Sequence, residues 1–197
     1  MAVAAIGLFF ISYQWGNHFQ RVNEAPLRLD GILLRPAVAL PDIVLRGPQG
    51  ELSAEQLRER WTLIAFGSPG SAAGHRGVAR LIEVWNRCAD RPELRDELLL
   101  LLVSADDAPA LARDFERLTP SLRVVSTSIT DLTTLREAFG AGDAEGDGPP
   151  PLYLLGPRAH FVALFTGTQP AQSVATDLKS MADRPDALPE LAVSTGE

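Results

Sequence analysis

Cysteine is almost absent from this chain of 197 residues, which contains a single one, Cys88. One cysteine excludes an intramolecular disulfide, so cysteine pairing gives no information about the redox compartment. Cys88 falls on the apolar stripe of a predicted helix, together with Val78, Leu81, Ile82 and Trp85. On such a stripe a cysteine is interpreted as a small buried hydrophobic residue, with a lone reactive thiol as the alternative.

Positive charge is also scarce, because 18 Lys and Arg face 25 Asp and Glu, for a net charge of −7. No basic cluster with interleaved aromatic residues occurs, and nucleic acid and anionic lipid both require a basic surface. We therefore predict no nucleic-acid partner. With 46% hydrophobic and 22% charged residues, the composition is that of one folded domain with short appendages.

A long hydrophobic run is missing as well. The charge-free segment Met1–Ile11, followed by Tyr13 and Trp15, is shorter than the roughly 20 residues that span a bilayer. It also lacks the charged start and the cleavage site of a signal peptide. We interpret residues 1–22 as a hydrophobic N-terminal anchor, an uncleaved transmembrane helix whose first residues precede the given sequence. A docked amphipathic N-terminus is the alternative, and the balanced flanking charges do not decide the membrane face.

The rest of the chain shows an alternation of strands and helices. Continuous hydrophobicity at Trp61–Phe66 and Glu97–Val103 indicates strands buried on both faces, as in a parallel sheet. The short turn between Leu152–Leu155 and His160–Phe165 requires an antiparallel hairpin. With right-handed crossovers, this order predicts an α/β protein, a thioredoxin-like three-layer sandwich with an N-terminal β-hairpin and a closing antiparallel β-hairpin.

The expected boundaries follow from turn and cap signals. We expect an anchor at 1–22, a linker at 23–39, the thioredoxin-like domain at 40–182 and a mobile tail at 183–197. Within the domain we expect a hairpin at 40–52, helices at 53–60, 75–89, 107–118, 130–139 and 170–181, and strands at 61–66, 97–103, 122–125, 152–155 and 160–165. The expected N-caps are Ser53, with Gln56 completing a capping box, Asp106 or Asp107, and Thr130 or Asp131.

The loop after the first central strand contains only small residues and one histidine, SPGSAAGH at 68–75. Thioredoxin-like proteins keep two active cysteines in this strand–loop–helix, and here there is none. Disulfide exchange needs thiols, so this loop cannot perform it.

Four segments, in this order, resemble the Sco/SenC family of membrane-anchored, copper-handling, thioredoxin-like proteins. They are LPDIVL through Gly50 at 40–50, WTLIAFG at 61–67, LLVSADD at 101–107 and YLLGPRA at 153–159. The similarity covers about residues 40–181. The resemblance implies a thioredoxin-like fold and a place in the maturation of a respiratory cytochrome oxidase.

The resemblance also implies a copper site made of two cysteines spaced C-x-x-x-C and a distant histidine. Aligned on Phe66 and Gly67, the cysteine positions hold Ser71 and His75, and the histidine position falls in 148–151, GPPP. Thiolates select Cu(I), and a serine hydroxyl is not a useful copper ligand. We therefore expect a degenerate member of the family, with no copper, no other cofactor and no catalytic residue.

Ser71 and His75 could instead form a nucleophile–base pair. The sequence shows no nucleophile elbow and no orienting carboxylate, so we expect Ser71 or Gly74 to cap the helix and His75 to be exposed. For the pair Asp106–Asp107, a helix N-cap is the simpler interpretation than a functional carboxylate pair. Pro151 lies just before a strand, where thioredoxin-like folds often place a cis-proline against the active loop.

We thus expect a non-catalytic, membrane-anchored accessory or assembly factor for cytochrome c oxidase. By resemblance it is bacterial and bound to the inner membrane, with its domain in the periplasm and oxidase subunits or assembly factors as partners. The alternatives are a thioredoxin- or peroxiredoxin-type oxidoreductase and a copper carrier with a non-standard ligand set. The expected partner-binding loop consists of Gly67, Ser68, Pro69, Gly70, Ser71, His75 and Pro151.

Overall fold

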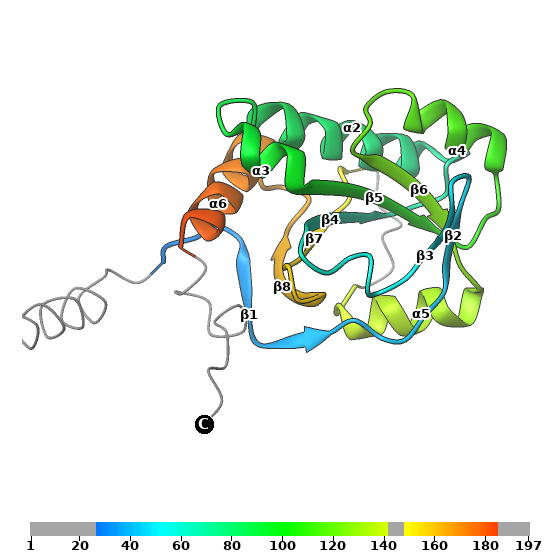
Figure 1. Cartoon of the computed structure of the whole chain (residues 1–197), viewed down its shortest axis with the longest axis horizontal. Helices are drawn as coiled ribbons and strands as arrows, with labels where there is room; N and C mark the ends of the chain where they lie inside the picture. Colours follow the sequence, from blue (N-terminus) through cyan, green and yellow to red (C-terminus); the bar gives the residue numbers. More distant parts are fainter. Residues whose placement is uncertain (1–26, 142–147, 185–197) are drawn as a thin grey trace, which may run out of the picture.

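The computed structural model describes residues 27–141 and 148–184, which form one mixed sheet covered by helices on both faces (Figure 1). Within these residues the sheet has eight strands in the order β1-β8-β7-β4-β5-β6-β2-β3. The strands are β1 (Ile32–Ala39), β2 (Leu45–Gly47), β3 (Gly50–Leu52), β4 (Trp61–Phe66), β5 (Leu98–Ser104), β6 (Leu122–Ser126), β7 (Leu152–Leu155) and β8 (His160–Phe165). The helices are α2 (Ala72–Arg87), α3 (Pro92–Glu97), α4 (Pro109–Glu116), α5 (Ile129–Ala138) and α6 (Ala171–Asp183).

The predicted thioredoxin-like three-layer sandwich is confirmed. Strands β4, β5 and β6 are parallel, and the closing hairpin β7–β8 adds antiparallel strands beside β4. Successive residues of a strand face opposite sides of a sheet. On β4, Leu63 accordingly packs in the core beneath α2, α3, α4 and α6, whereas Ile64 packs in the core beneath α5. Burial on both faces explains the unbroken apolar runs of β4 and β5.

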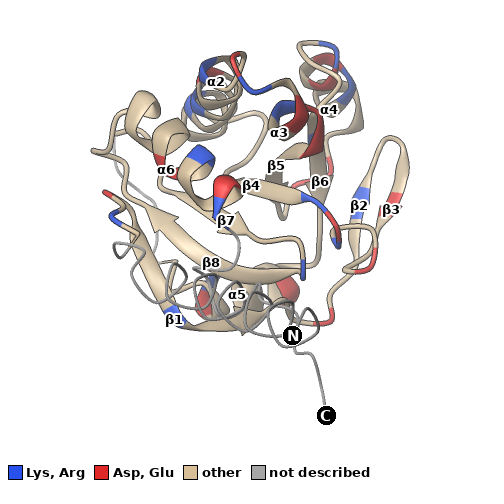
Figure 2. Cartoon of the chain, turned by 60° about the vertical axis from the view of Figure 1, so that its left-hand side comes forward, with Lys and Arg blue, Asp and Glu red and all other residues tan. Residues whose placement is uncertain are grey.

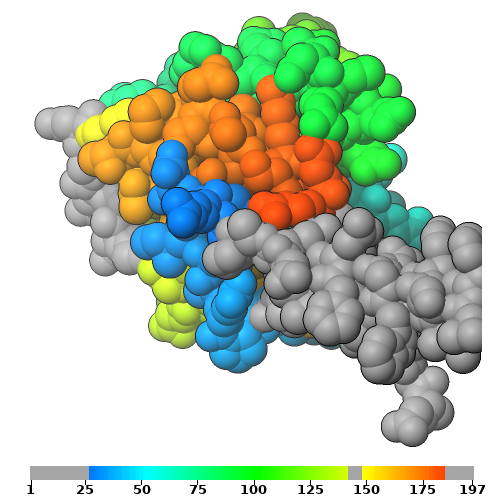
Figure 3. Space-filling view, turned by 90° about the vertical axis from the view of Figure 1, so that its left-hand side faces the viewer, coloured from blue at the N-terminus to red at the C-terminus, as the bar shows by residue number. Residues whose placement is uncertain are grey.

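The predicted linker is wrong in its second half, because residues 32–39 form β1. This strand pairs antiparallel with β8 at the edge of the sheet, and the register shifts between Leu33 and Val38. Pro36 lies inside that shift, where it removes no ladder hydrogen bond, which is how an edge strand tolerates proline. Figure 3 shows the blue N-terminal segment against the orange and red of α6. There the carboxylate of Asp177 accepts the backbone N–H of Gly31 at 2.8 Å.

The capping box at Ser53 is present, but no helix follows it. The Gln56 side chain accepts the Ser53 backbone N–H at 2.9 Å, and Ser53 Oγ accepts the Gln56 N–H at 3.4 Å. The residues that follow form turns, and the chain leaves them at Glu59 with a φ of +65°. The short helix α3, which was not predicted, begins at Pro92 and ends directly before β5.

Two other predicted N-caps are wrong. Helix α5 is capped by Ser128, whose hydroxyl accepts the Asp131 N–H at 3.0 Å. Helix α4 begins at Pro109, and its N-cap, Ala108, makes no side-chain cap hydrogen bond. Proline at the first helical position needs no N–H partner and is already in helical φ, so α4 starts without a carboxylate cap. Asp106 and Asp107 are both exposed ahead of it.

The predicted anchor at 1–22 and nearly all of the predicted tail lie outside the described residues. In the part of the chain that the structure describes, no helix has the length and apolar character needed to cross a membrane.

Thr62→Val should stabilise the protein. The Thr62 hydroxyl is buried in β4 and has no hydrogen-bond partner among the described residues. Valine has the same shape without the unsatisfied hydroxyl, so we expect the free energy of unfolding to rise by about 1 kcal/mol and Tm by about 2–4 °C. Thr133→Val is the control, because the Thr133 hydroxyl is exposed and donates to the Ile129 carbonyl at 2.9 Å. Thermal unfolding that gives equal Tm shifts for both variants would contradict the prediction.

Candidate functional site

The loop that joins β4 to α2 is held by hydrogen bonds to β5, within itself and to the first turn of α2. Its first residue, Gly67, donates its N–H to the Val103 carbonyl of β5 at 3.1 Å. The Ser71 hydroxyl donates to the Ser68 carbonyl at 2.9 Å and accepts the Gly74 N–H at 3.0 Å. Ser71 is therefore the N-cap of α2, as predicted, and its single hydroxyl proton is committed to a backbone carbonyl.

His75 lies on the first turn of α2, is exposed as predicted, and packs on a neighbouring helix. Its ring meets the ring of Phe115 of α4 edge-on, with the centroids 5.1 Å apart. Because the Ser71 hydroxyl donates within its own loop, the described residues contain no nucleophile–base pair at this position.

The start of α2 and the first residues of the loop approach each other backbone to backbone. A Cβ atom added to Gly74 would lie 1.9 Å from the Ser68 carbonyl oxygen. One added to Gly67 would lie 2.9 Å from Gly74 Cα. Glycine at both positions is what allows this close approach. The loop therefore packs closely on the start of α2.

Pro151 lies beside this loop, but not in the expected conformation. In the antiparallel register of β4 and β7, Thr62 faces Leu155 and Ile64 faces Tyr153, which places Pro151 level with Phe66. Within the described residues the only cis peptide bond is Arg35–Pro36, so the cis-proline expected at Pro151 is wrong.

A buried arginine, which the sequence analysis did not single out, holds the segment before β7. Arg80 of α2 is only 6% exposed and donates to the carbonyls of Pro150, Thr166 and Gln169, the last two at 2.6 and 2.8 Å. Burial lowers the pKa of its guanidinium group from the ordinary value. The sequence feature that could have indicated its burial is its place between the apolar residues Val78 and Leu81. Arg80 thus links the segment before β7, at Pro150, to the turn between β8 and α6.

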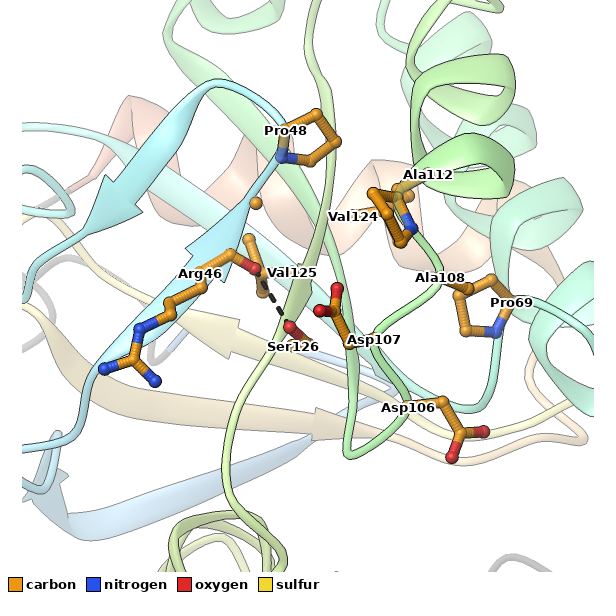
Figure 4. Close-up of a pocket in the computed structure, with 12 residues that line it drawn as sticks. Arg46, Pro48, Pro69, Asp106, Asp107, Ala108, Ala112, Val124, Val125 and Ser126 are labelled. Atoms are coloured by element: carbon orange, nitrogen blue, oxygen red, sulfur yellow. Dashed lines mark hydrogen bonds between the residues drawn. The ribbon is translucent and has the colours of Figure 1, made fainter.

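On the other side of the loop, where the parallel strands end, the surface contains a cavity of about 220 Å³ (Figure 4). It lies between the β2–β3 hairpin, Pro69 of the loop, the start of α4 and the end of β6. The lining residues are Arg46, Gly47, Pro48, Pro69, Asp106, Asp107, Ala108, Pro109, Ala112, Val124, Val125 and Ser126.

The cavity has apolar walls and one carboxylate that points into it. In Figure 4 the side chain of Asp107 points into the space beside Ser126, whereas that of Asp106 points away. Arg46 also extends away from the cavity and pairs with Glu51 at 3.3 Å. Figure 2 shows this pair as the blue patch on β2 and the red patch on β3. The negative charge of Asp107 therefore has no cationic partner within the lining of the cavity.

An exposed apolar residue borders the loop. Leu111 of α4 is 41% exposed, and its Cδ1 would lie 4.0 Å from a Cβ atom on Gly70. The structure therefore brings the predicted loop residues 67–71 together with Asp107 and Leu111, which the sequence analysis did not connect with them. His75 lies one helical turn away, and Pro151 lies on the β7 side.

Among the described residues, no group of three or more His, Cys, Asp and Glu side chains could hold a metal ion. At the two positions that resemble copper ligands, the Ser71 hydroxyl is engaged in the cap of α2 and the His75 ring packs on Phe115.

The thiol of Cys88 should be unreactive in the folded protein. Cys88 is completely buried, as predicted, and burial raises the pKa of its thiol, so the reactive thiolate is disfavoured. We expect a disulfide reagent such as DTNB to leave the native chain unmodified and to titrate one thiol in about 6 M guanidinium chloride. Rapid stoichiometric labelling of the native chain would show that the thiol is accessible.

Comparison with known proteins identifies the fold. No protein-family model matches the chain, and no curated protein gives a significant match. Solved structures do match, and they define the chain as an α/β protein of the thioredoxin-like class. The particular variant of that fold is the one found in Sco proteins, as the resemblance in the sequence implied.

Three of these structures illustrate the likeness. Apo Sco1 from Thermus thermophilus is 20% identical, covers 80% of this chain and 99% of its own, and has a TM-score of 0.62. Copper-bound ScoI from Bradyrhizobium japonicum is 19% identical, covers 72% and 98%, and has a TM-score of 0.55. BsSco, a member of the Sco family of cytochrome c oxidase assembly proteins, is 16% identical, covers 74% and 94%, and has a TM-score of 0.59.

Proposed function

We propose that this chain is a degenerate member of the Sco/SenC family that acts by binding a protein partner, as a non-catalytic assembly or accessory factor for cytochrome c oxidase. The observation that carries the proposal is the state of Ser71. At the position that resembles the first copper cysteine, its hydroxyl closes the loop and caps α2. The position therefore has a structural role, on a scaffold with the fold of proteins that include a cytochrome c oxidase assembly factor.

The residues around the loop favour a site that binds a protein partner over a site for copper or thiol chemistry. Soft thiolates are the ligands that select Cu(I), and the only thiol of the chain is that of Cys88, which is buried at the C-terminal end of α2. What the loop does present is a backbone packed closely on α2, the exposed Leu111 beside it and the cavity that contains Asp107. A fixed, partly apolar surface with a small pocket is typical of a site for a protein partner.

The proposal extends to location. Residues 1–22 would anchor the chain in the bacterial inner membrane, with the domain facing the periplasm and close to oxidase subunits. Protease treatment of spheroplasts would test this orientation: a periplasmic domain is degraded without lysis, whereas a cytoplasmic one is degraded only after lysis.

The test of the function is a gene deletion in the source organism, followed by measurement of cytochrome c oxidase activity and of the oxidase haem absorbance. We expect both to fall on deletion and to recover with the full chain or with Cys88→Ser, which changes the one thiol of the chain and lies outside the expected partner-binding loop. Gly70→Trp, which enlarges the exposed loop without removing a polar group, should fail to restore them.

Full oxidase assembly in the deletion strain would contradict the role in assembly. Loss of complementation by Cys88→Ser in normally folded protein would contradict the proposal that the chain acts without a reactive thiol. Stoichiometric, tight Cu(I) binding by the full chain in a chelator competition would favour a copper carrier instead.

A further inference from the structure

We propose that the cavity between the β2–β3 hairpin and α4 is a socket for a single basic side chain, lysine or arginine, of the partner protein. This inference rests on the proposed function, in that it names the chemistry by which the binding surface recognises its partner. Three features of the cavity carry the inference: its shape, its charge and its place in the fold.

The shape of the cavity suits a long side chain with an apolar stem. Its volume is about 220 Å³, and Pro48, Pro69, Ala112 and Val124 supply apolar walls. Lysine and arginine bury their methylene stems against such walls while the charged end stays near polar groups or water. A short polar side chain would leave these walls in contact with water.

The charge of the cavity selects a cation. Asp107 points into the space, and no hydrogen bond or ion pair of its carboxylate is found among the described residues (Figure 4). The one basic residue of the lining, Arg46, extends away and pairs with Glu51. The exposed carboxylate of Asp106 adds negative charge at the rim. A carboxylate ligand would be repelled, whereas an ammonium or guanidinium group would find a partner.

The place of the cavity connects it with the loop. It lies where the parallel strands β5 and β6 end, the edge at which open α/β sheets bind their ligands. Pro69 belongs both to the loop and to the cavity wall, and the neighbouring Gly70 borders the exposed Leu111. If a partner segment placed a basic residue in the socket, the residue next to it in the partner would therefore contact Leu111.

The test uses the full chain in lipid nanodiscs, with methyl groups of alanine and valine labelled for NMR and EDTA present. The probes are the capped tripeptides Ala-Lys-Ala and Ala-Arg-Ala, with the Ala-norleucine-Ala and Ala-Glu-Ala peptides as controls of equal length. We expect the two basic peptides to shift the methyl signals of Ala112, Val124 and Val125, and the controls to leave them in place. Raising the salt concentration should weaken binding.

Asp107→Asn should weaken binding of the basic peptides about tenfold, because it removes a charge-assisted hydrogen bond. The matched control is Asp114→Asn, since Asp114 is an exposed carboxylate of α4 that already pairs with Arg117 at 3.0 Å. The control should leave peptide affinity unchanged. Equal shifts from norleucine and lysine peptides, unchanged affinity in Asp107→Asn, or shifts confined to other methyl groups would each overturn the socket.

The socket and the proposed function fail in different ways. If the deletion strain loses oxidase and Asp107→Asn restores it in full, the assembly role stands and the socket is wrong. If the deletion strain keeps its oxidase while the peptides bind as expected, the socket stands and the assembly role is wrong.

Discussion

Gly74→Ala is expected to lower the free energy of unfolding by about 3 kcal/mol, the upper end of the cost of overpacking. The added methyl group would lie 1.9 Å from the Ser68 carbonyl oxygen and 2.7 Å from its carbon, which no side-chain rotation can relieve. The Ser68 carbonyl is itself fixed, because it accepts from the Ser71 N–H at 3.0 Å and from the Ser71 hydroxyl at 2.9 Å. Chemical denaturation of the wild type and of Gly74→Ala measures the difference in free energy of unfolding.

Gly70→Ala is the matched control in the same loop. A Cβ atom on Gly70 would meet only the Ser68 hydroxyl at 3.8 Å and Leu111 at 4.0 Å, which are ordinary contacts. Its effect should stay within about 0.5 kcal/mol, as for most surface substitutions. Equal stability of wild type and Gly74→Ala would mean that the Ser68 carbonyl and the start of α2 do not meet backbone to backbone.

Arg80→Met is expected to lower the free energy of unfolding by about 3 kcal/mol. Methionine can replace the buried stem of Arg80, but it leaves the carbonyls of Pro150, Thr166 and Gln169 without their donor. Pro150 is buried and its carbonyl cannot turn to bulk water, whereas Thr166 is exposed, so part of the loss is recovered by hydration. Thermal and urea unfolding would measure the change.

Arg87→Met is the control for Arg80→Met, on the same helix. The Arg87 side chain is about half exposed and contacts Glu83 at 3.3 Å and Gln172 at 2.9 Å. Exposed pairs of this kind contribute about 0.2–1 kcal/mol, so the control should change stability little. If both variants lose the same stability, the buried carbonyls do not depend on Arg80.

The central strands were predictable from the sequence because their signal is local. The apolar runs of β4 and β5 have to be buried on both faces, which in a chain of this length requires a covered parallel sheet. The cap at Ser71 was also predictable, since a small polar residue ahead of an amphipathic stretch satisfies the first free N–H groups. These features depend on residues within a few positions of each other.

The missed features depend on residues far apart in the chain. Strand β1 contains Pro36 and is a strand only because β8 lies beside it, about 125 residues later. The carboxylate of Asp107 looked like a helix cap, but Pro109 starts α4 without one. Asp107 lies in a cavity because the β2–β3 hairpin pairs with β6 at Arg46 and Ser126, and this long-range pairing cannot be predicted from the local sequence. The carbonyls that hold Arg80 come from two other loops.

The attachment of β1 to α6 also gives the domain a route for mechanical load. Tension applied at the N-terminal end of the described chain would reach Asp177 first, since its carboxylate accepts the N–H groups of Asp30 and Gly31. From there the load would pass into α6, whose buried face packs with that of α2 in a single core. Because α2 begins directly after its N-cap Ser71, tension at the N-terminal end of the described chain would reach the loop at residues 67–71.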